Sequence, residues 1–150
     1  VGVEDEALIK AYSDDFFAEI VYKKKTMPHA VEALEYLSSK YNLYILSNGF
    51  RELQEQKMRS AGVDKYFKKV VLSEDIGVHK PFPEIFYFAM SATQSELHTS
   101  LMIGDNWEND IAGAKDAGLG QVFYNVKKTT KFSFQPTGII EDWNEIGKIL

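Results

Sequence analysis

The chain has 150 residues without cysteine, and its 17 Lys and Arg against 22 Asp and Glu give a net charge of −5. This length suits a single domain, and the 45% hydrophobic and 26% charged fractions are typical of a globular protein. The lack of cysteine excludes a disulfide scaffold, a thiol nucleophile and a cysteine-type zinc site. The acidic balance argues against a nucleic-acid partner, because neutralising phosphates takes clustered Lys and Arg.

No stretch of the sequence predicts a membrane span or a targeting signal. The apolar runs are far shorter than the roughly 20 residues that a transmembrane helix needs. The first residues include Glu4, Asp5 and Glu6, whereas a secretory signal begins with basic residues and continues into an apolar run. We therefore expect a cytoplasmic protein with no membrane partner.

The first half of the chain predicts two helices, a strand and a third helix. Apolar residues recur at helical spacing from Leu8 to Ile20, so residues 4–22 are expected to form an amphipathic helix. Pro28 favours the first turn of a second helix, with Thr26 as its cap. The next expected elements are a short buried strand at 43–46 and a helix at 51–61 that stops at Gly62.

The second half continues this alternation. Strands are expected at 69–72, 101–103, 121–124 and 139–140, and helices at 83–91, 107–117 and 142–150. Short apolar strands that alternate with helices indicate an α/β fold with three αβα layers around a parallel, Rossmann-like sheet. Ligands of such folds bind outside the carboxyl ends of the strands, so functional residues are expected directly after strands.

Two stretches that follow strands could bind a phosphate group. Ser47, Asn48 and Gly49 come after the strand at 43–46, where a hydroxyl and backbone N–H groups can bind phosphate oxygens. The alternative for these residues is an ordinary turn, since all three are common turn residues. Lys80 precedes Pro81, and an ammonium held there can neutralise a phosphoryl group. The alternative for Lys80 is a solvated loop residue.

A third stretch could hold a metal ion. Asp105 ends the strand at 101–103, and Asp110 lies in the first turns of the next helix. Two carboxylates at one sheet edge suit a hard cation such as Mg²⁺. They could equally cap the helix, because acidic residues favour helix N-termini. The sequence contains no Walker-type phosphate loop, no G-x-S-x-G motif and no H-E-x-x-H motif.

In this order, the three stretches resemble motifs of the haloacid dehalogenase (HAD) superfamily. The matching pieces are Tyr44 to Phe50 with Ser47, Ser73 to Pro81 with Lys80, and Ile103 to Asp110 with Asp105. The resemblance runs from about residue 26 to the C-terminus. The Ser-Asn-Gly-Phe and Trp-Glu-Asn-Asp segments are most similar to the capped branch that contains nucleotide phosphatases of the pyrimidine nucleoside monophosphate type.

The resemblance implies a Mg²⁺-dependent phosphohydrolase of small phosphorylated metabolites, such as nucleoside monophosphates. A carboxylate of such an enzyme attacks phosphorus, and water then cleaves the aspartyl-phosphate. By the same likeness, Lys80 is catalytic and stabilises both the nucleophile and the phosphate. Asp105 would ligate Mg²⁺, and Asp110, which the likeness makes catalytic together with Lys80, would support the metal site or Lys80. The residues implied to bind the phosphoryl oxygens are Ser47, Asn48, Gly49 and Lys80.

One part of the family pattern is not found in this sequence. The family's nucleophile belongs to an Asp-x-Asp motif after the first, central strand, and no two Asp residues here are two positions apart. Residues 1–25 resemble the remnant of a helical cap, and residues 26–150 an incomplete core without the first central strand. We therefore expect an inactive C-terminal fragment. Its two strands beside the gap should either pair with each other or recruit another chain, which favours self-association.

Two other hypotheses compete with this one. The chain could be a non-catalytic interaction or regulatory module that keeps a truncated HAD fold. A receiver-type signalling domain has a similar architecture, but it needs an early acidic cluster and a late lysine. The order Ser47, Lys80, Asp105 is wrong for such a domain.

Overall fold

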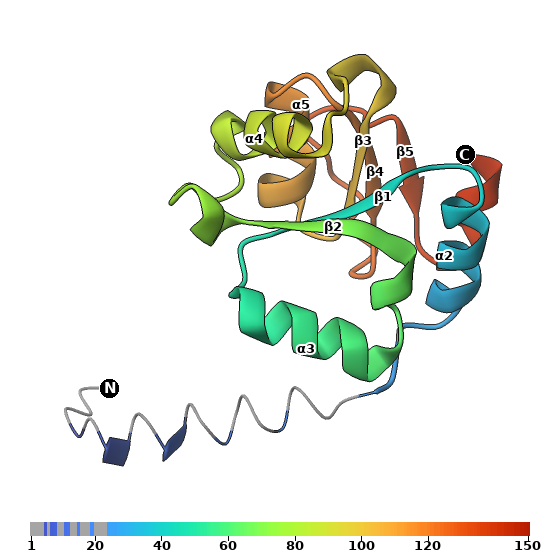
Figure 1. Ribbon diagram of the computed structural model, residues 1–150. Helices are drawn as coiled ribbons and strands as arrows, with labels where there is room; N and C mark the ends of the chain where they lie inside the picture. Colours follow the sequence, from blue (N-terminus) through green and yellow to red (C-terminus); the bar gives the residue numbers. More distant parts are fainter. Residues whose placement is uncertain (1–4, 6, 9–10, 13–14, 16–18, 20–23) are drawn as a thin grey trace.

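The computed structural model describes residues 5, 7–8, 11–12, 15, 19 and 24–150 (Figure 1). Most of the helix expected at 4–22, and with it the expected cap remnant at 1–25, lies outside the described residues. The remainder is an α/β structure in which strands and helices alternate, as predicted. Among its helices, none combines the length and the hydropathy that crossing a bilayer requires.

The described part of the chain contains short parallel strands separated by helices. The strands are β1 (Leu43–Ser47), β2 (Phe67–Leu72), β3 (Leu101–Gly104), β4 (Gly120–Tyr124) and β5 (Gly138–Ile140). The α-helices are α2 (Ala30–Ser38), α3 (Arg51–Ala61), α4 (Pro83–Thr93) and α5 (Gly113–Asp116). The 3₁₀ segments are η1 (Asp64–Tyr66), η2 (Ser73–Asp75), η3 (Leu97–Thr99) and η5 (Trp143–Lys148), and the π-helix is η4 (Trp107–Ala112).

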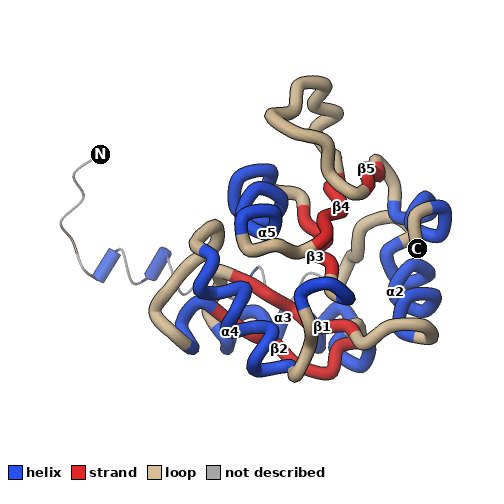
Figure 2. Tube along the Cα trace, turned by 90° about the horizontal axis from the view of Figure 1, so that it is seen from above, coloured by secondary structure: helices blue, strands red, loops and turns tan. Residues whose placement is uncertain are grey.

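The strands form two separate parallel sheets instead of one. β1 pairs with β2, with Ser47 opposite Leu72, and β3 pairs with β4, with Gly104 opposite Phe123. β5 continues the second sheet beside β4. No pairing joins β1 to β3 within the described residues, and Figure 2 shows the two sheets apart. Of the two expected outcomes, pairing of these strands with each other is therefore not found, whereas the expected gap between them is present.

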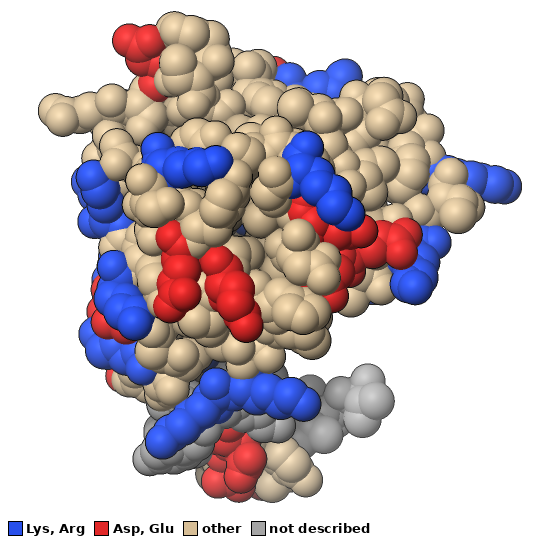
Figure 3. Space-filling view, turned by 90° about the vertical axis from the view of Figure 1, so that its right-hand side faces the viewer, with Lys and Arg blue, Asp and Glu red and all other residues tan. Residues whose placement is uncertain are grey.

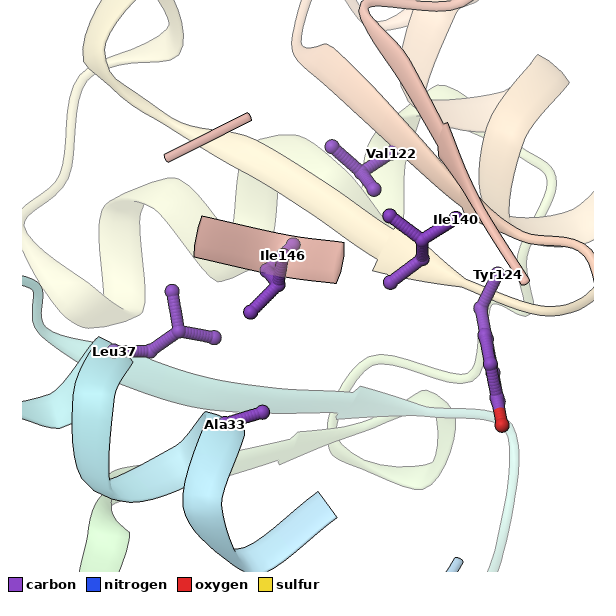
Figure 4. Packing of buried hydrophobic residues seen from close by; sticks show 6 residues of the cluster. All are labelled: Ala33, Leu37, Val122, Tyr124, Ile140 and Ile146. Carbon is purple, nitrogen blue, oxygen red and sulfur yellow. The ribbon is translucent and has the colours of Figure 1, made fainter. Parts of the chain in front are cut away.

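Helices on both faces hold the two sheets together. In β3, Leu101 and Ile103 pack toward α2, whereas Met102 packs toward α4 and α5, as the two-residue period of a strand requires. β1 divides its side chains in the same way, with Leu43 toward α2 and Leu46 toward α4. Both clusters thus reach across the gap. Figure 4 shows the first of them, made by Ala33, Leu37, Val122, Tyr124, Ile140 and Ile146.

A cavity of about 1220 Å³ occupies the gap between the sheets. Its walls include residues 43–46 of β1 and 101–103 of β3, and apolar residues of α2 and α4 line the two remaining sides. All residues of β1 and β3 are only partly buried, although four of the five in β4 are buried. The cavity is thus bordered by the open edges of two apolar strands and covered by helices on both faces. This is the environment of a central strand in a parallel sheet.

Several helical segments differ from their predictions in bounds or in type. α3 has the expected bounds, and Gly62 ends it in the left-handed region at φ 68°. α2 begins later than Pro28 suggested, after His29, and no side chain caps it, so the expected Thr26 cap is wrong. The single helix expected at 107–117 is divided into the π-helix η4 and α5. The expected C-terminal helix is the 3₁₀ segment η5.

Surface charges of both signs are interspersed on the face that carries α2 and the C-terminus (Figure 3). On another part of the surface, Arg51 at the start of α3 forms ion pairs with Glu55, Glu74 and Asp75. The backbone N–H of Leu72 donates to the Asp75 carboxylate, and this bond, with the nearby Arg51 guanidinium, holds the pKa of Asp75 below its ordinary value. The folded state therefore prefers the ionised form of Asp75.

The lowered pKa of Asp75 predicts a loss of stability in acid. A carboxyl group whose pKa is depressed by folding stabilises the protein above its unfolded pKa of about 3.9, and this contribution disappears as the pH falls through the folded value. The free energy of unfolding should therefore fall below about pH 4. In Asp75→Asn the fall should be shallower, as measured by urea unfolding across that range. An unchanged slope would contradict the assignment.

Candidate active site

The three stretches singled out in the sequence lie at the carboxyl ends of the strands. Ser47 is the last residue of β1, and Asp105 directly follows β3. Lys80 lies in the loop between η2 and α4, and its ammonium reaches both the β1 backbone and the helix after β3. The structure thus connects the Ser47 and Asp105 strand ends through Lys80, from opposite sides of the gap.

Lys80 is held by two hydrogen bonds in a nearly dry environment. Its Nζ donates to Asp110 Oδ1 at 2.7 Å and to the Leu46 carbonyl at 2.8 Å, and its side chain is only 10% exposed. An ammonium group has three donors. Within the described residues the third N–H has no acceptor, so Lys80 presents a fixed positive charge with one donor left for a ligand.

Asn48 holds the backbone of Lys80 in place. Its Nδ2 donates to the Lys80 carbonyl at 3.0 Å, and its Oδ1 accepts from the Lys80 N–H at 2.8 Å. Both functions of the amide are therefore used on the loop backbone. The sequence predicted that Asn48 binds phosphate, but the structure places this side chain in a bridge between two loops.

The hydroxyl of Ser47 is oriented by two donors. Ser47 Oγ accepts from the Gly49 N–H at 3.0 Å and from Gln54 Nε2 at 2.7 Å. A hydroxyl oxygen has two acceptor lone pairs and one donor, so the O–H hydrogen is what remains for a ligand. The sequence reasoning missed Gln54. Its position in the first turn of the helix that follows the Ser47 turn could have indicated it, because helical side chains lean toward the N-terminus.

Asp110 is buried, and both of its carboxylate oxygens have partners. Its side chain is 8% exposed; Oδ1 pairs with Lys80, and Oδ2 accepts from the Asn106 N–H at 3.0 Å. Asp110 therefore serves as the anchor of Lys80 and of the turn after β3. The sequence suggested that Asp110 supports either the metal or Lys80, and its observed partners are the Lys80 ammonium and the Asn106 N–H.

Gly104 allows Asp110 to approach the end of β3. A Cβ atom at position 104 would lie 2.4 Å from the Asp110 Cβ, closer than real Cβ contacts. We expect Gly104→Ala to push Asp110 away from Lys80 and to lower the free energy of unfolding by about 1–3 kcal/mol, as overpacking does. Urea unfolding measures this, and Gly120→Ala is the control, because its nearest neighbour would lie at 3.5 Å. Equal effects of the two substitutions would contradict the steric argument.

Asp105, directly after β3, has an exposed carboxylate that is available to a metal ion. Its neighbour Asn106 caps the following helix by accepting from the Asn109 N–H. The described residues contain no group of three or more His, Asp or Glu that could hold a metal by themselves. Mg²⁺ usually takes only one or two protein carboxylates, completed by waters and phosphate oxygens. Asp105 therefore fits Mg²⁺ as one part of a ligand set.

Aromatic side chains fasten the neighbouring loop to the site. Trp107, two residues after Asp105, packs against Phe123, Phe132 and Phe134 with ring centroids about 5 Å apart, within the range of favourable aromatic pairs. The Trp107 indole N–H also donates to Ser133 at 3.3 Å. The long loop after β4 is thereby tied to the helix that carries Asp110.

The sequence is similar to a family model and to characterised proteins. A family model for haloacid dehalogenase-like hydrolases matches residues 2–118. The pyrimidine 5'-nucleotidase YjjG of Escherichia coli is 35% identical over 118 residues, which are 78% of this chain and 51% of that protein. The phosphoserine phosphatase of Thermus thermophilus is 36% identical over 81 residues, 54% of this chain and 32% of that one. The chain spans about half the length, or less, of such curated relatives.

Solved structures share the fold as well. The magnesium-bound HAD-hydrolase YfnB of Bacillus subtilis superposes with a TM-score of 0.84 at 27% identity, covering 95% of this chain and 67% of that one. A HAD phosphatase from Thermococcus onnurineus superposes with a TM-score of 0.77 at 28% identity, covering 83% of this chain and 58% of that one. The two separate sheets found here thus correspond to part of a larger structure.

Proposed function

Because the chain belongs to the haloacid dehalogenase-like hydrolase family, we propose that it forms the phosphate-binding part of a Mg²⁺-dependent phosphate-monoester hydrolase. One observation carries the proposal. Lys80 and Ser47, from segments on either side of β2, each keep one donor hydrogen after all their observed bonds are made. Two fixed donors and a positive charge, with Asp105 nearby in the fold, suit a phosphoryl group that carries negative charge.

Each residue has a distinct task in this proposal. Ser47 donates its hydroxyl hydrogen, and Lys80 its third N–H, to non-bridging oxygens of the substrate phosphate. Asn48 holds the backbone of Lys80 and Asp110 holds its ammonium group, so that the third N–H of the ammonium is directed to the phosphate. Asp105 would hold Mg²⁺, which when bound supplies charge neutralisation at the phosphoryl group.

The nucleophile would come from a strand outside the 150 residues. We propose that such a strand, ending in Asp-x-Asp, fills the cavity between β1 and β3 and places a carboxylate at the same edge. The carboxylate oxygen attacks phosphorus, and the bond from phosphorus to the ester oxygen breaks as the leaving alcohol takes a proton from the second Asp. Water then attacks the phosphorus of the aspartyl-phosphate and gives a proton back to the second Asp, the acyl-phosphate bond breaks, and phosphate and the free carboxylate are released.

The proposed substrates are small phosphorylated metabolites. Relatives include phosphatases named for a pyrimidine nucleotide, for phosphoserine and for glyceraldehyde 3-phosphate. The Ser-Asn-Gly-Phe segment supports the nucleotide branch, so a nucleoside monophosphate is our first candidate. The experiment is to add a synthetic apolar strand that ends in Asp-x-Asp and to assay nucleoside monophosphates and p-nitrophenyl phosphate with Mg²⁺.

We expect Mg²⁺-dependent turnover from this reconstituted complex. Lys80→Met should reduce the turnover by about 10²-fold or more, as removal of a charged transition-state donor does. Lys115→Met is the control, because Lys115 is half exposed and lies on α5. Turnover that survives in Lys80→Met, or that needs no Mg²⁺, would refute the proposal.

Without the strand, Mg²⁺ binding should be weak. Asp105 offers one free carboxylate, whereas both oxygens of Asp110 are occupied. Titration calorimetry of the 150-residue chain should therefore give an affinity weaker than micromolar. A micromolar affinity that is lost in Asp105→Asn would show that the described residues already hold a complete site.

A further inference from the structure

We propose that Gln54 is a positioning residue that directs the Ser47 hydroxyl hydrogen toward the substrate phosphate; this inference rests on the proposed function. Gln54 lies in the first turn of α3, seven residues after Ser47, and its Nε2 is 2.7 Å from Ser47 Oγ. Neither the sequence motif nor the family resemblance pointed to it.

A hydroxyl group can accept two hydrogen bonds and donate one. The Gly49 N–H already fills one lone pair of Ser47 Oγ, at 3.0 Å. The Gln54 amide group fills the second, so the remaining capacity of the hydroxyl is to donate. Without Gln54, the hydroxyl could rotate and accept a hydrogen bond from water. With Gln54, the partner must be an acceptor, such as a phosphate oxygen.

Gly49 makes room for this contact. A Cβ atom at position 49 would lie 2.5 Å from Gln54 Nε2 and 3.2 Å from the next atoms of that side chain. The glycine therefore lets the Gln54 amide lie over the turn that carries Ser47. Gly49 does not adopt a positive φ, so close approach is the reason for a glycine here.

The orientation of the amide determines the direction of the hydrogen bond. If Gln54 presented its oxygen to Ser47, the hydroxyl hydrogen would point to Gln54 and be lost to a phosphate. Gln54→Glu creates this situation, because a carboxylate only accepts. Gln54→Met keeps the size of the side chain and removes both polar atoms.

The test is a double-mutant cycle on phosphate affinity. Inorganic phosphate is titrated into the 150-residue chain and followed by phosphorus NMR, at a protein concentration where the oligomeric state is constant. Ser47→Ala should weaken binding about tenfold, the effect of one hydrogen bond to a charged group. Gln54→Met should weaken it about threefold and Gln54→Glu at least tenfold, because the glutamate also repels phosphate.

Two further variants separate positioning from folding. In the Ser47→Ala background, Gln54→Met should have no further effect, because no hydroxyl remains to be directed. Gly49→Ala, which displaces the Gln54 amide without removing it, should match Gln54→Met. The matched control is Gln56→Met, since Gln56 donates to Glu52 elsewhere on α3 and should leave phosphate affinity unchanged.

Each outcome decides a separate question. If the wild-type chain binds no phosphate, the proposed function and this inference both fail. If Ser47→Ala weakens binding but Gln54→Met does not, only the inference fails. An equal loss from Gln54→Met with and without Ser47 would show a merely structural role and overturn the inference. Phosphate binding that is unchanged in Gln54→Glu would also overturn it.

Discussion

Without a strand between β1 and β3, the 150-residue chain is expected to self-associate and to hydrolyse neither p-nitrophenyl phosphate nor nucleotides above background. The two strands face a cavity of about 1220 Å³ with partly buried apolar side chains, and their facing edges have no strand partner among the described residues. Buried backbone groups must find partners, and open apolar edges recruit other chains. Analytical ultracentrifugation across a concentration series and a phosphate-release assay measure the two effects.

A strand that fills the gap should reverse both effects together. The synthetic apolar strand ending in Asp-x-Asp is expected to shift the chain toward a one-to-one complex, to raise its melting temperature and to give turnover. The matched control ends in Asn-x-Asn; it should restore the assembly and the stability without turnover. Robust turnover of the chain alone, abolished by Asp105→Asn, would show that the 150 residues contain a nucleophile after all.

Breaking the ion pair between Lys80 and Asp110 should have the largest effect on stability of any single substitution in the site. Both side chains are about nine-tenths buried, at 10% and 8% exposure. Asp110→Ala leaves the Lys80 ammonium buried without its counter-charge, and such losses cost about 3–5 kcal/mol. Urea unfolding should show this decrease, while phosphate titration should show weaker binding because Lys80 is no longer held.

The double variant Lys80→Met/Asp110→Leu is the control for this interpretation. Replacing both charges by apolar groups removes the unpaired charge, so most of the stability should return although the site is lost. Asp116→Ala is a matched surface control, since its contact with Lys115 is long and exposed and should be worth less than about 1 kcal/mol. If Asp110→Ala cost no more than Asp116→Ala, the ion pair would not hold the site.

The sequence by itself determined the order in which strands and helical segments alternate, although not the type of every helical segment. α3 has its predicted bounds because an amphipathic segment is followed by Gly62, which adopts the left-handed conformation that ends a helix. The strands were found because each is a short apolar run between turn residues. The order of Ser47, Lys80 and Asp105 after these strands was sufficient to identify the family, since signals of this kind lie within a few neighbouring residues.

Only the tertiary structure decided how the site is assembled and where the fold stays open. Asn48 is 32 positions from Lys80, and Lys80 is 30 positions from Asp110. No local sequence pattern therefore shows that these residues form hydrogen bonds with one another. The contact of Gln54 with Ser47 likewise depends on how α3 packs over the turn. The local pattern of β1 and β3 predicts two strands with apolar side chains, but it does not show whether they pair, because pairing joins segments far apart in the sequence. Within the described residues no pairing joins them, and both strands line the cavity.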